Sequence, residues 1–95
     1  MVMGKVATAI DSKLRAAFAP VRLAIEDESS KHHGHAGWRE GGETHFRVEI
    51  VSPAFEGKTR VARQRLVYAA LKEELDAGLH ALAMETLTPA EDKKA

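Results

Sequence analysis

Residues 51–80 read VSPAFEGKTRVARQRLVYAALKEELDAGLH, and the other elements of the fold can be placed around this stretch. Val67, Leu71 and Leu75 recur in it at intervals of four residues, which puts their side chains along one side of a helix. An apolar stripe of this kind has to pack against a core. The stripe is widened by the neighbouring apolar residues Val61, Leu66, Tyr68 and Ala70.

The bounds of this helix follow from the residues at its ends. We expect it to span about Thr59 to Ala77, because Gly78 tolerates the left-handed conformation that commonly ends a helix. The turn before it covers residues 52–58, and the run from about Leu79 to Leu87 is typical of a strand. The stretch therefore predicts a strand end, a turn, a long helix and a further strand.

The N-terminal part of the chain adds a helix and two strands. Apolar residues at helical spacing predict a helix over residues 4–19, and Pro20 prevents its continuation. Residues 21–27 and 45–50 alternate between apolar and polar side chains, which is the period of a strand covered on one face. A polar, glycine-rich loop over residues 28–42 joins these strands.

Ninety-five residues hold one domain, and these elements predict its architecture. The first two strands should be antiparallel, since a loop joins them directly. The third should run parallel to the second, through a right-handed crossover. We predict an α/β (α+β) fold with the order α-β-β-α-β, in which a mixed three-stranded sheet carries both helices on one face. Its ordered core covers about residues 4–89, and residues 90–95 form a frayed, charged tail.

Composition narrows the classes of function. Lys plus Arg and Asp plus Glu are 14 each, so no overall charge attracts nucleic acid or a membrane. The absence of cysteine excludes disulfides, a thiol nucleophile and a metal site built from the chain's own thiolates. No apolar run approaches the roughly 18 residues of a membrane span, and no signal core begins the chain. We therefore expect a cytoplasmic protein, or one in the matrix of an organelle if a presequence has been removed. We also expect no enzymatic activity, because no catalytic motif is present.

Histidines gather in the loop and recur before the last strand. His32, His33 and His35 lie beside glycines, which let the backbone aim more than one imidazole at the same point. Imidazole commonly binds zinc, iron, copper and nickel, although histidines in polar loops also occur without a ligand. His80 either satisfies a carbonyl at the end of the long helix or stands accessible. By topology, His80 and the loop lie at the same end of the sheet.

Two histidines alone supply only half of the ligands that a four-coordinate metal site needs. A closed zinc site usually needs four ligands, whereas histidines replace cysteines on one iron of a Rieske centre. The missing thiolates would then come from a partner. His45 is not counted among these ligands, because it alternates with Phe46 and should point to the solvent face of the sheet as a structural residue.

A basic patch marks the start of the long helix, where four cations fall within eight residues and could contact phosphates. A helix start repels cations through its dipole, so these residues need an outside partner such as a carboxylate or a phosphate. Against a nucleic-acid site, the preceding turn lacks the G-x-x-G of a KH loop. A solvated helix face is the alternative. The patch consists of Lys58, Arg60, Arg63 and Arg65.

Several separated motifs make the chain resemble the BolA family. They are E-T-H-F-R-V at residues 43–48, V-S-x-x-F-x-G at 51–57, G-L-H-A-L at 78–82 and T-L-T-P at 86–89. The resemblance runs from the first helix to Pro89. The residues that carry it include Val51, Ser52, Phe55, Gly57, Arg63, Arg65, Val67, Tyr68, Gly78, Leu79, His80, Ala81 and Leu82.

The resemblance implies a partner and a cofactor. BolA-like proteins pair with monothiol glutaredoxins around a shared [2Fe-2S] cluster, whose sulfur ligands come from the glutaredoxin and glutathione. The BolA side gives a C-terminal histidine, which matches His80, and a second ligand from the loop. For that second ligand His35 stands ahead of His32, with His33 third. Such an adaptor would serve iron homeostasis or cluster transfer.

A second role is also implied. BolA-like proteins are described as transcriptional regulators that bind duplex DNA, and the predicted fold resembles the class II KH arrangement, a nucleic-acid-binding scaffold. The basic patch would then contact phosphates. We further expect a weak homodimer of the protein without its cluster, and no membrane partner.

Overall fold

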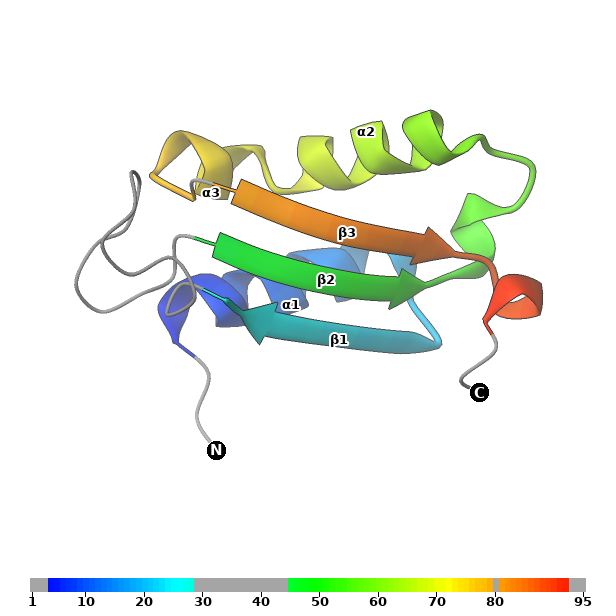
Figure 1. Ribbon diagram of the computed structural model, residues 1–95, viewed down its shortest axis with the longest axis horizontal. Helices are drawn as coiled ribbons and strands as arrows, with labels where there is room; N and C mark the ends of the chain where they lie inside the picture. Colours follow the sequence, from blue (N-terminus) through cyan, green and yellow to red (C-terminus); the bar gives the residue numbers. More distant parts are fainter. Residues whose placement is uncertain (1–3, 29–44, 80, 93–95) are drawn as a thin grey trace.

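The computed structural model describes residues 4–28, 45–79 and 81–92. Helices pack against a single sheet in this part of the chain. The elements are α1 (Lys5–Phe18), β1 (Arg22–Asp27), β2 (His45–Val51), η2 (Pro53–Phe55), α2 (Arg60–Ala70), α3 (Lys72–Asp76), β3 (Ala81–Leu87) and η3 (Pro89–Glu91), where η denotes a 3-10 turn. In Figure 1, α1 lies behind the strands and α2 runs along β3. The predicted order α-β-β-α-β is confirmed, with the second helix divided in two.

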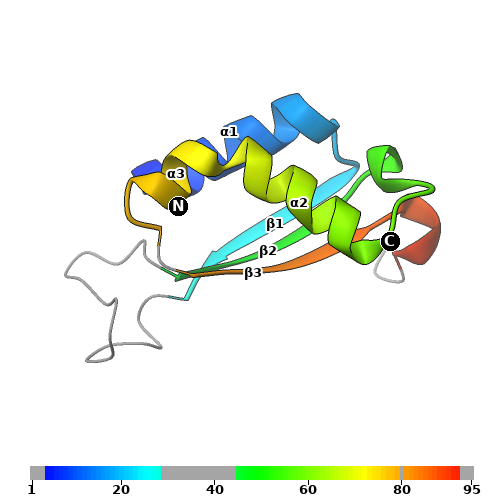
Figure 2. The same cartoon turned by 90° about the horizontal axis from the view of Figure 1, so that it is seen from above.

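β2 lies in the centre of the sheet, between β1 and β3. β1 pairs antiparallel with β2, so that Ile25 is opposite Val48. β3 pairs parallel with β2, with Met84 opposite the same Val48. Both strand directions agree with the prediction. The view in Figure 2 shows α1, α2 and α3 on one face of the sheet, and no helix of the described residues lies on the other face.

The core lies between the covered face of the sheet and the helices. Phe46, Val48 and Ile50 alternate along β2 and are 2% exposed or less, as the period of a half-covered strand requires. The predicted apolar faces of the first helix and of the second strand are therefore confirmed. Their fully buried partners from the helices are Ile10, Leu14, Val67 and Leu71.

Hydrogen bonds of Ser52 connect the turn after β2 to the end of α1. Its hydroxyl donates to the Phe18 carbonyl oxygen at 2.6 Å and accepts from the Ala54 N–H at 3.0 Å. In η2, the Phe55 ring packs against the Phe18 ring with their centroids 5.2 Å apart. The V-S-x-x-F motif therefore ties the end of the central strand to the helical layer.

The long helix predicted over residues 59–77 is interrupted, so that prediction is wrong in its continuity. α2 begins where expected, because the Thr59 hydroxyl accepts from the Ala62 N–H at 3.1 Å. It ends at Ala70, because the next residue, Leu71, has a φ of −106° and a ψ of 18°, which lie outside the helical region. No glycine or proline lies at the break. Gly78 does have a positive φ, 125°, just after the predicted helix end.

The buried face of α2 is narrower than the sequence predicts. Val67 and Leu71 are fully buried, but Val61, Leu66 and Tyr68 expose 54%, 39% and 43% of their surface. A helix that packs on one face of a small sheet buries only a narrow stripe, and these three residues lie beside it. Apolar side chains therefore remain on the outer face of α2.

The C-terminal residues are ordered further than predicted. Residues 89–91 form η3, and Asp92 pairs with Arg22 of β1 through contacts of 2.9 and 3.0 Å. The Asp92 side chain is only 4% exposed. A frayed tail is therefore wrong for residues 90–92, because hydrogen-bonded charge pairs hold them against the sheet.

Candidate functional site

The residues that flank the histidine-rich loop and those that flank His80 lie at the same end of the sheet. β1 finishes there with Asp27 opposite Phe46, and β3 begins there with Ala81 opposite His45. The Glu28 N–H donates to the His45 carbonyl oxygen at 2.8 Å, so the pairing extends to the start of the loop. We call this region, defined by these five residues, the histidine end.

The predicted ligands themselves, His32, His33, His35 and His80, lie outside the described residues, so their ligation of iron stays a prediction. Within residues 4–28, 45–79 and 81–92, no group of three or more His, Asp or Glu side chains could hold a metal ion. The structure therefore describes the flanks of the predicted site and not its ligands.

His45 is predicted to lie on the solvent face of the sheet as a structural residue, and the structure corrects its exposure, because the residue is buried. Alternation along β2 puts its side chain on the same face as Arg47 and Glu49, which is the open face that the sequence predicts. Only 6% of the residue is exposed, however. Alternation determines which face of a sheet a side chain occupies, but it does not determine what covers that face.

An apolar groove of about 330 Å³ lies beside the histidine end, and residues of α1 and α3 line it. Leu79 lines it and directly precedes His80 in the chain. Lys13 joins the two helices, because its Nζ lies 3.0 Å from the Glu73 carboxylate and 2.8 Å from that of Glu74. The other residues that line the groove are Lys5, Val6, Ala9, Glu73, Glu74 and Ala77.

Arg63 is engaged within the protein, unlike the rest of the predicted basic patch. Its guanidinium donates to the carbonyl oxygens of Lys58 and Thr86, both at 3.0 Å, and to the Glu91 carboxylate at 2.7 Å. The Arg63 side chain is 11% exposed. These bonds join α2, β3 and η3, so Arg63 does not stand free for a phosphate.

Glu91 is held as an ionised carboxylate by the same contacts. The bond from Arg63, assisted by the Thr88 backbone, lowers the pKa of Glu91 to about 2. The Thr88 N–H donates to the Glu91 carboxylate at 2.8 Å, and the Glu91 N–H donates to the Thr88 hydroxyl at 3.3 Å. This reciprocal capping box fixes η3 against the end of β3.

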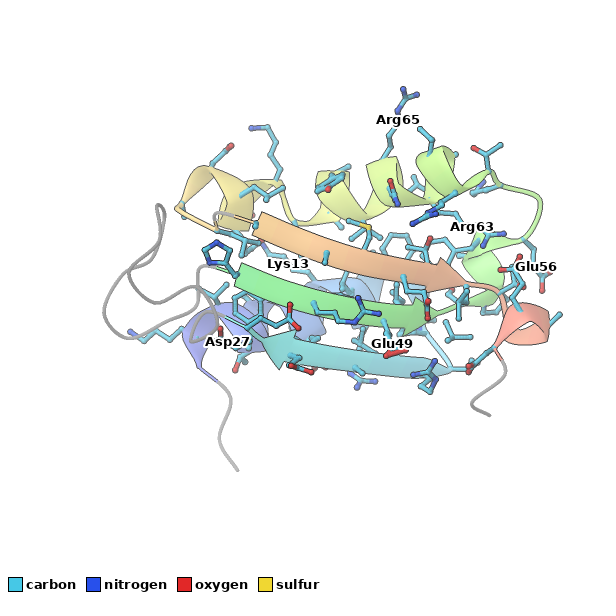
Figure 3. The ribbon with its side chains drawn as sticks, in the orientation of Figure 1. Lys13, Asp27, Glu49, Glu56, Arg63 and Arg65 are labelled. Atoms are coloured by element: carbon cyan, nitrogen blue, oxygen red, sulfur yellow. The ribbon has the colours of Figure 1, made fainter. Side chains whose placement is uncertain are left out.

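The other residues of the basic patch are exposed and divide between two surfaces. Figure 3 shows Arg65 projecting from the outer side of α2, away from the sheet, whereas Arg63 lies towards β3. Arg60 lines a hollow of about 550 Å³ beside β3, and Lys58 lies in the preceding turn. We call this hollow the edge hollow. Its lining residues are Arg47, Arg60, Arg63, Met84, Glu85, Thr86, Leu87 and Glu91.

Sequence reasoning missed Arg47, which lines the edge hollow together with the patch residues Arg60 and Arg63. In the sequence, Arg47 is one polar residue of an alternating strand, far from the patch. Only the parallel pairing of β2 with β3, in which Arg47 lies opposite Ala83, brings it to the same hollow.

A family model described as BolA-like protein matches residues 14–91 of the chain. The chain belongs to the BolA family. The chloroplastic protein BOLA1 of Arabidopsis thaliana is 53% identical to it over 90% of this chain. The DNA-binding transcriptional regulator BolA of Escherichia coli is 47% identical over 83% of this chain. Among solved structures, the BolA domain of SufE1 from Arabidopsis thaliana has a TM-score of 0.86 at 45% identity, covering 96% of this chain and 100% of that one.

Family membership confirms the resemblance and the BolA fold. This BolA chain spans 54% of the length of the chloroplastic protein and 71% of that of the bacterial regulator. Their names describe a BolA protein and a DNA-binding regulator, and neither names an enzymatic activity. In the described part of the chain, no helix has both the length and the hydropathy to cross a membrane.

Proposed function

We propose that this BolA chain is an adaptor that binds a monothiol glutaredoxin and shares a [2Fe-2S] cluster with it. His80 supplies one ligand and the loop supplies the other, for which His35 stands ahead of His32 and His33. The histidine end supports this proposal, because β1 finishes where β2 and β3 begin. The described flanks of both stretches therefore meet at one end of the sheet.

The donor atoms of the chain fit half of such a cluster. The chain has five histidines and no cysteine, so it offers imidazole nitrogens but no thiolate to iron. Two imidazoles replace two thiolates on one iron of a Rieske centre. A glutaredoxin with bound glutathione carries the complementary thiolates. The two proteins would complete together a ligand set that this chain lacks alone.

The apolar groove between α1 and α3 offers the glutaredoxin a surface on which to pack. Its small side chains, Ala9 and Ala77, leave room for an apolar side chain of the partner beside Leu79. Burial of such a side chain stabilises a complex through the hydrophobic effect. An adaptor of this kind serves iron homeostasis or cluster transfer, in the cytoplasm or in the matrix of an organelle.

The test is a titration of a cluster-loaded monothiol glutaredoxin with this protein, followed by visible absorption and circular dichroism. We expect the spectrum to change and to saturate at equal amounts of the two proteins. His80→Ala should remove the change, since one iron loses a nitrogen ligand. His35→Ala should reduce it more than His32→Ala or His33→Ala. A spectrum that stays that of the glutaredoxin alone contradicts the proposal.

Ala9→Glu separates docking from ligation. It introduces a charge into the apolar groove while every histidine remains, so it should weaken the complex of the two proteins without a cluster. His80→Ala should leave that complex intact. Calorimetry on the cluster-free proteins measures both effects, and equal affinity for Ala9→Glu and wild type would exclude the groove as the contact.

Binding of duplex DNA is a second candidate function. The name of the Escherichia coli relative favours it, as do the exposed cations Lys58, Arg60 and Arg65 around the start of α2. We expect the affinity for DNA to fall with salt, because bound phosphates release counterions. Changing Arg60 and Arg65 together to Ala should reduce the salt slope by about two. An affinity without salt dependence would contradict this function.

A further inference from the structure

β3 is an edge strand whose outer side faces away from β2. On the inner side, the Leu87 carbonyl oxygen accepts the Ser52 N–H at 2.9 Å. Because backbone groups alternate in direction along a strand, those of every second residue point outward. Arg63 reaches one of these groups, the Thr86 carbonyl oxygen, at 3.0 Å. The residues of β3 whose backbone N–H and C=O groups point away from β2 are Leu82, Met84 and Thr86.

Along this edge, Arg63 forms a hydrogen bond only with the Thr86 carbonyl oxygen, near the end of β3. Among the described residues, no hydrogen bond involves the outward N–H or C=O of Met84. An open strand edge is a template for another strand, and proteins commonly guard such an edge with charged side chains. In this protein the charged side chains at the edge include arginines, which favour an added strand that carries negative charges.

The edge hollow lies along this edge, and residues from both faces of the sheet line it. Arg60 and Arg63 reach the hollow from α2, on the covered face. Arg47 reaches it from β2, on the open face, across the short side chain of Ala83. Met84 adds apolar surface between them. A segment bound along the edge would therefore meet an arginine on either side.

Of these three arginines, one forms a salt bridge with another described residue. Glu91 neutralises Arg63, with 2.7 Å between their nearest atoms. Arg47 and Arg60 form no ion pair in the described part of the chain. Glu85 is exposed and is the other acid that lines the hollow. Three arginines against two glutamates leave the hollow cationic.

We propose that the edge hollow binds an extended acidic peptide segment, which adds to β3 as a further strand. Its backbone pairs with the outward N–H and C=O of Met84, as in other cases of strand addition. Side chains of an added strand alternate between the two faces, so its carboxylates meet Arg60 on one face and Arg47 on the other. The proposal does not depend on cluster ligation, because Thr86 lies near the opposite end of β3 from the histidine end.

A peptide fits this edge better than a nucleic acid does. The edge offers N–H donors and C=O acceptors at the spacing of a peptide backbone, which a strand matches residue by residue. Single-stranded nucleic acids bind mainly by stacking bases on aromatic side chains. None of the described residues that line the hollow is aromatic. A phosphate backbone would also lie close to Glu85 and Glu91.

The probe for this site is a short synthetic peptide that alternates Glu with Val, added to isotope-labelled protein. We expect saturable NMR shifts along β3 and slower exchange of the Met84 amide, since hydrogen bonding protects an amide. Arg60→Ala should weaken binding about tenfold, through loss of a charge-assisted contact. Arg65→Ala is the matched control, because Arg65 is exposed on the same helix but lies outside the hollow. It should leave the affinity unchanged.

Two further peptides separate charge from strand addition. Replacing Glu with Lys should abolish binding, and N-methylation of the amides that face β3 should abolish it with the charges intact. Equal binding of the Lys peptide, or no protection of Met84, overturns the proposal. Shifts that appear only with a single-stranded oligonucleotide overturn it too. So does protection of Met84 that rises with protein concentration alone, because a second copy of the chain would then occupy the edge.

Discussion

At Glu91, one carboxylate connects residues from separate elements. It accepts from the Arg63 guanidinium at 2.7 Å and from the Thr88 N–H at 2.8 Å. Both bonds favour the ionised form, and Arg63 contributes most to the fall of the pKa from 4.5 to about 2. Because the pKa is depressed on folding, the stability linked to Glu91 is present above pH 4.5 and is lost as the pH falls through about 2.

Glu91→Gln should therefore lower the melting temperature at neutral pH, and the difference from wild type should disappear near pH 2. Thermal melts followed by circular dichroism across the acid range measure this. Glu56→Gln, at an exposed glutamate of the turn before α2, is the control and should leave the melting temperature at neutral pH unchanged. A difference for Glu91→Gln that stays constant at every pH would show that the ion pair is not its cause.

The division of the second helix depends on Leu71. Its N–H is shared between the carbonyl oxygens of Val67 at 3.1 Å and Tyr68 at 3.2 Å, the bifurcated pattern common at helix ends. Leu71 is fully buried, whereas Leu66 of the same helix is 39% exposed. α2 and α3 therefore meet at a core residue, and not at a residue that breaks helices.

Leu71→Ala should lower the free energy of unfolding by about 2–5 kcal/mol, because it leaves a cavity where the two helices meet. Leu66→Ala makes the same chemical change on an exposed side and should cost less than about 1 kcal/mol. Urea denaturation of both variants measures the difference. Equal losses would mean that Leu71 does not anchor the junction.

At the scale of the whole molecule, polar contacts as well as the core join the helices to the sheet. The Ser52 hydroxyl is one of them, and its bond to the Phe18 carbonyl oxygen is fully buried. It joins the last turn of α1 to the end of the central strand. A middle part of α1 is held to α3 instead, through the contacts of Lys13 with Glu73 and Glu74.

Ser52→Ala should cost about 1–3 kcal/mol of unfolding free energy, because it removes the donor to a buried carbonyl oxygen. Ser12→Ala, at an exposed position of α1, is the control and should change the free energy by less than about 0.5 kcal/mol. Urea denaturation compares the two. A small effect of Ser52→Ala would mean that water replaces the hydroxyl at the Phe18 carbonyl.

The sequence by itself determined the order of the elements, the faces of the strands and their directions. These are properties of periodicity and of chain connection: alternation along β2 records which side is buried, and a helical crossover requires β3 to run parallel to β2. The same reasoning predicted one end of the sheet for the histidine-bearing segments, and the flanks of both do meet there.

Only the tertiary structure decided how individual residues are used. Arg63 is an unremarkable member of a basic patch until Glu91, 28 residues later, binds it. Arg47 comes to the edge hollow through strand pairing, and His45 is buried although alternation puts it on the face away from the helices. α2 and α3 meet at Leu71, a fully buried residue, where the sequence has no glycine or proline. Local spacing carries no information about contacts between residues far apart in the chain, and those contacts determine which charges are paired and which remain for a partner.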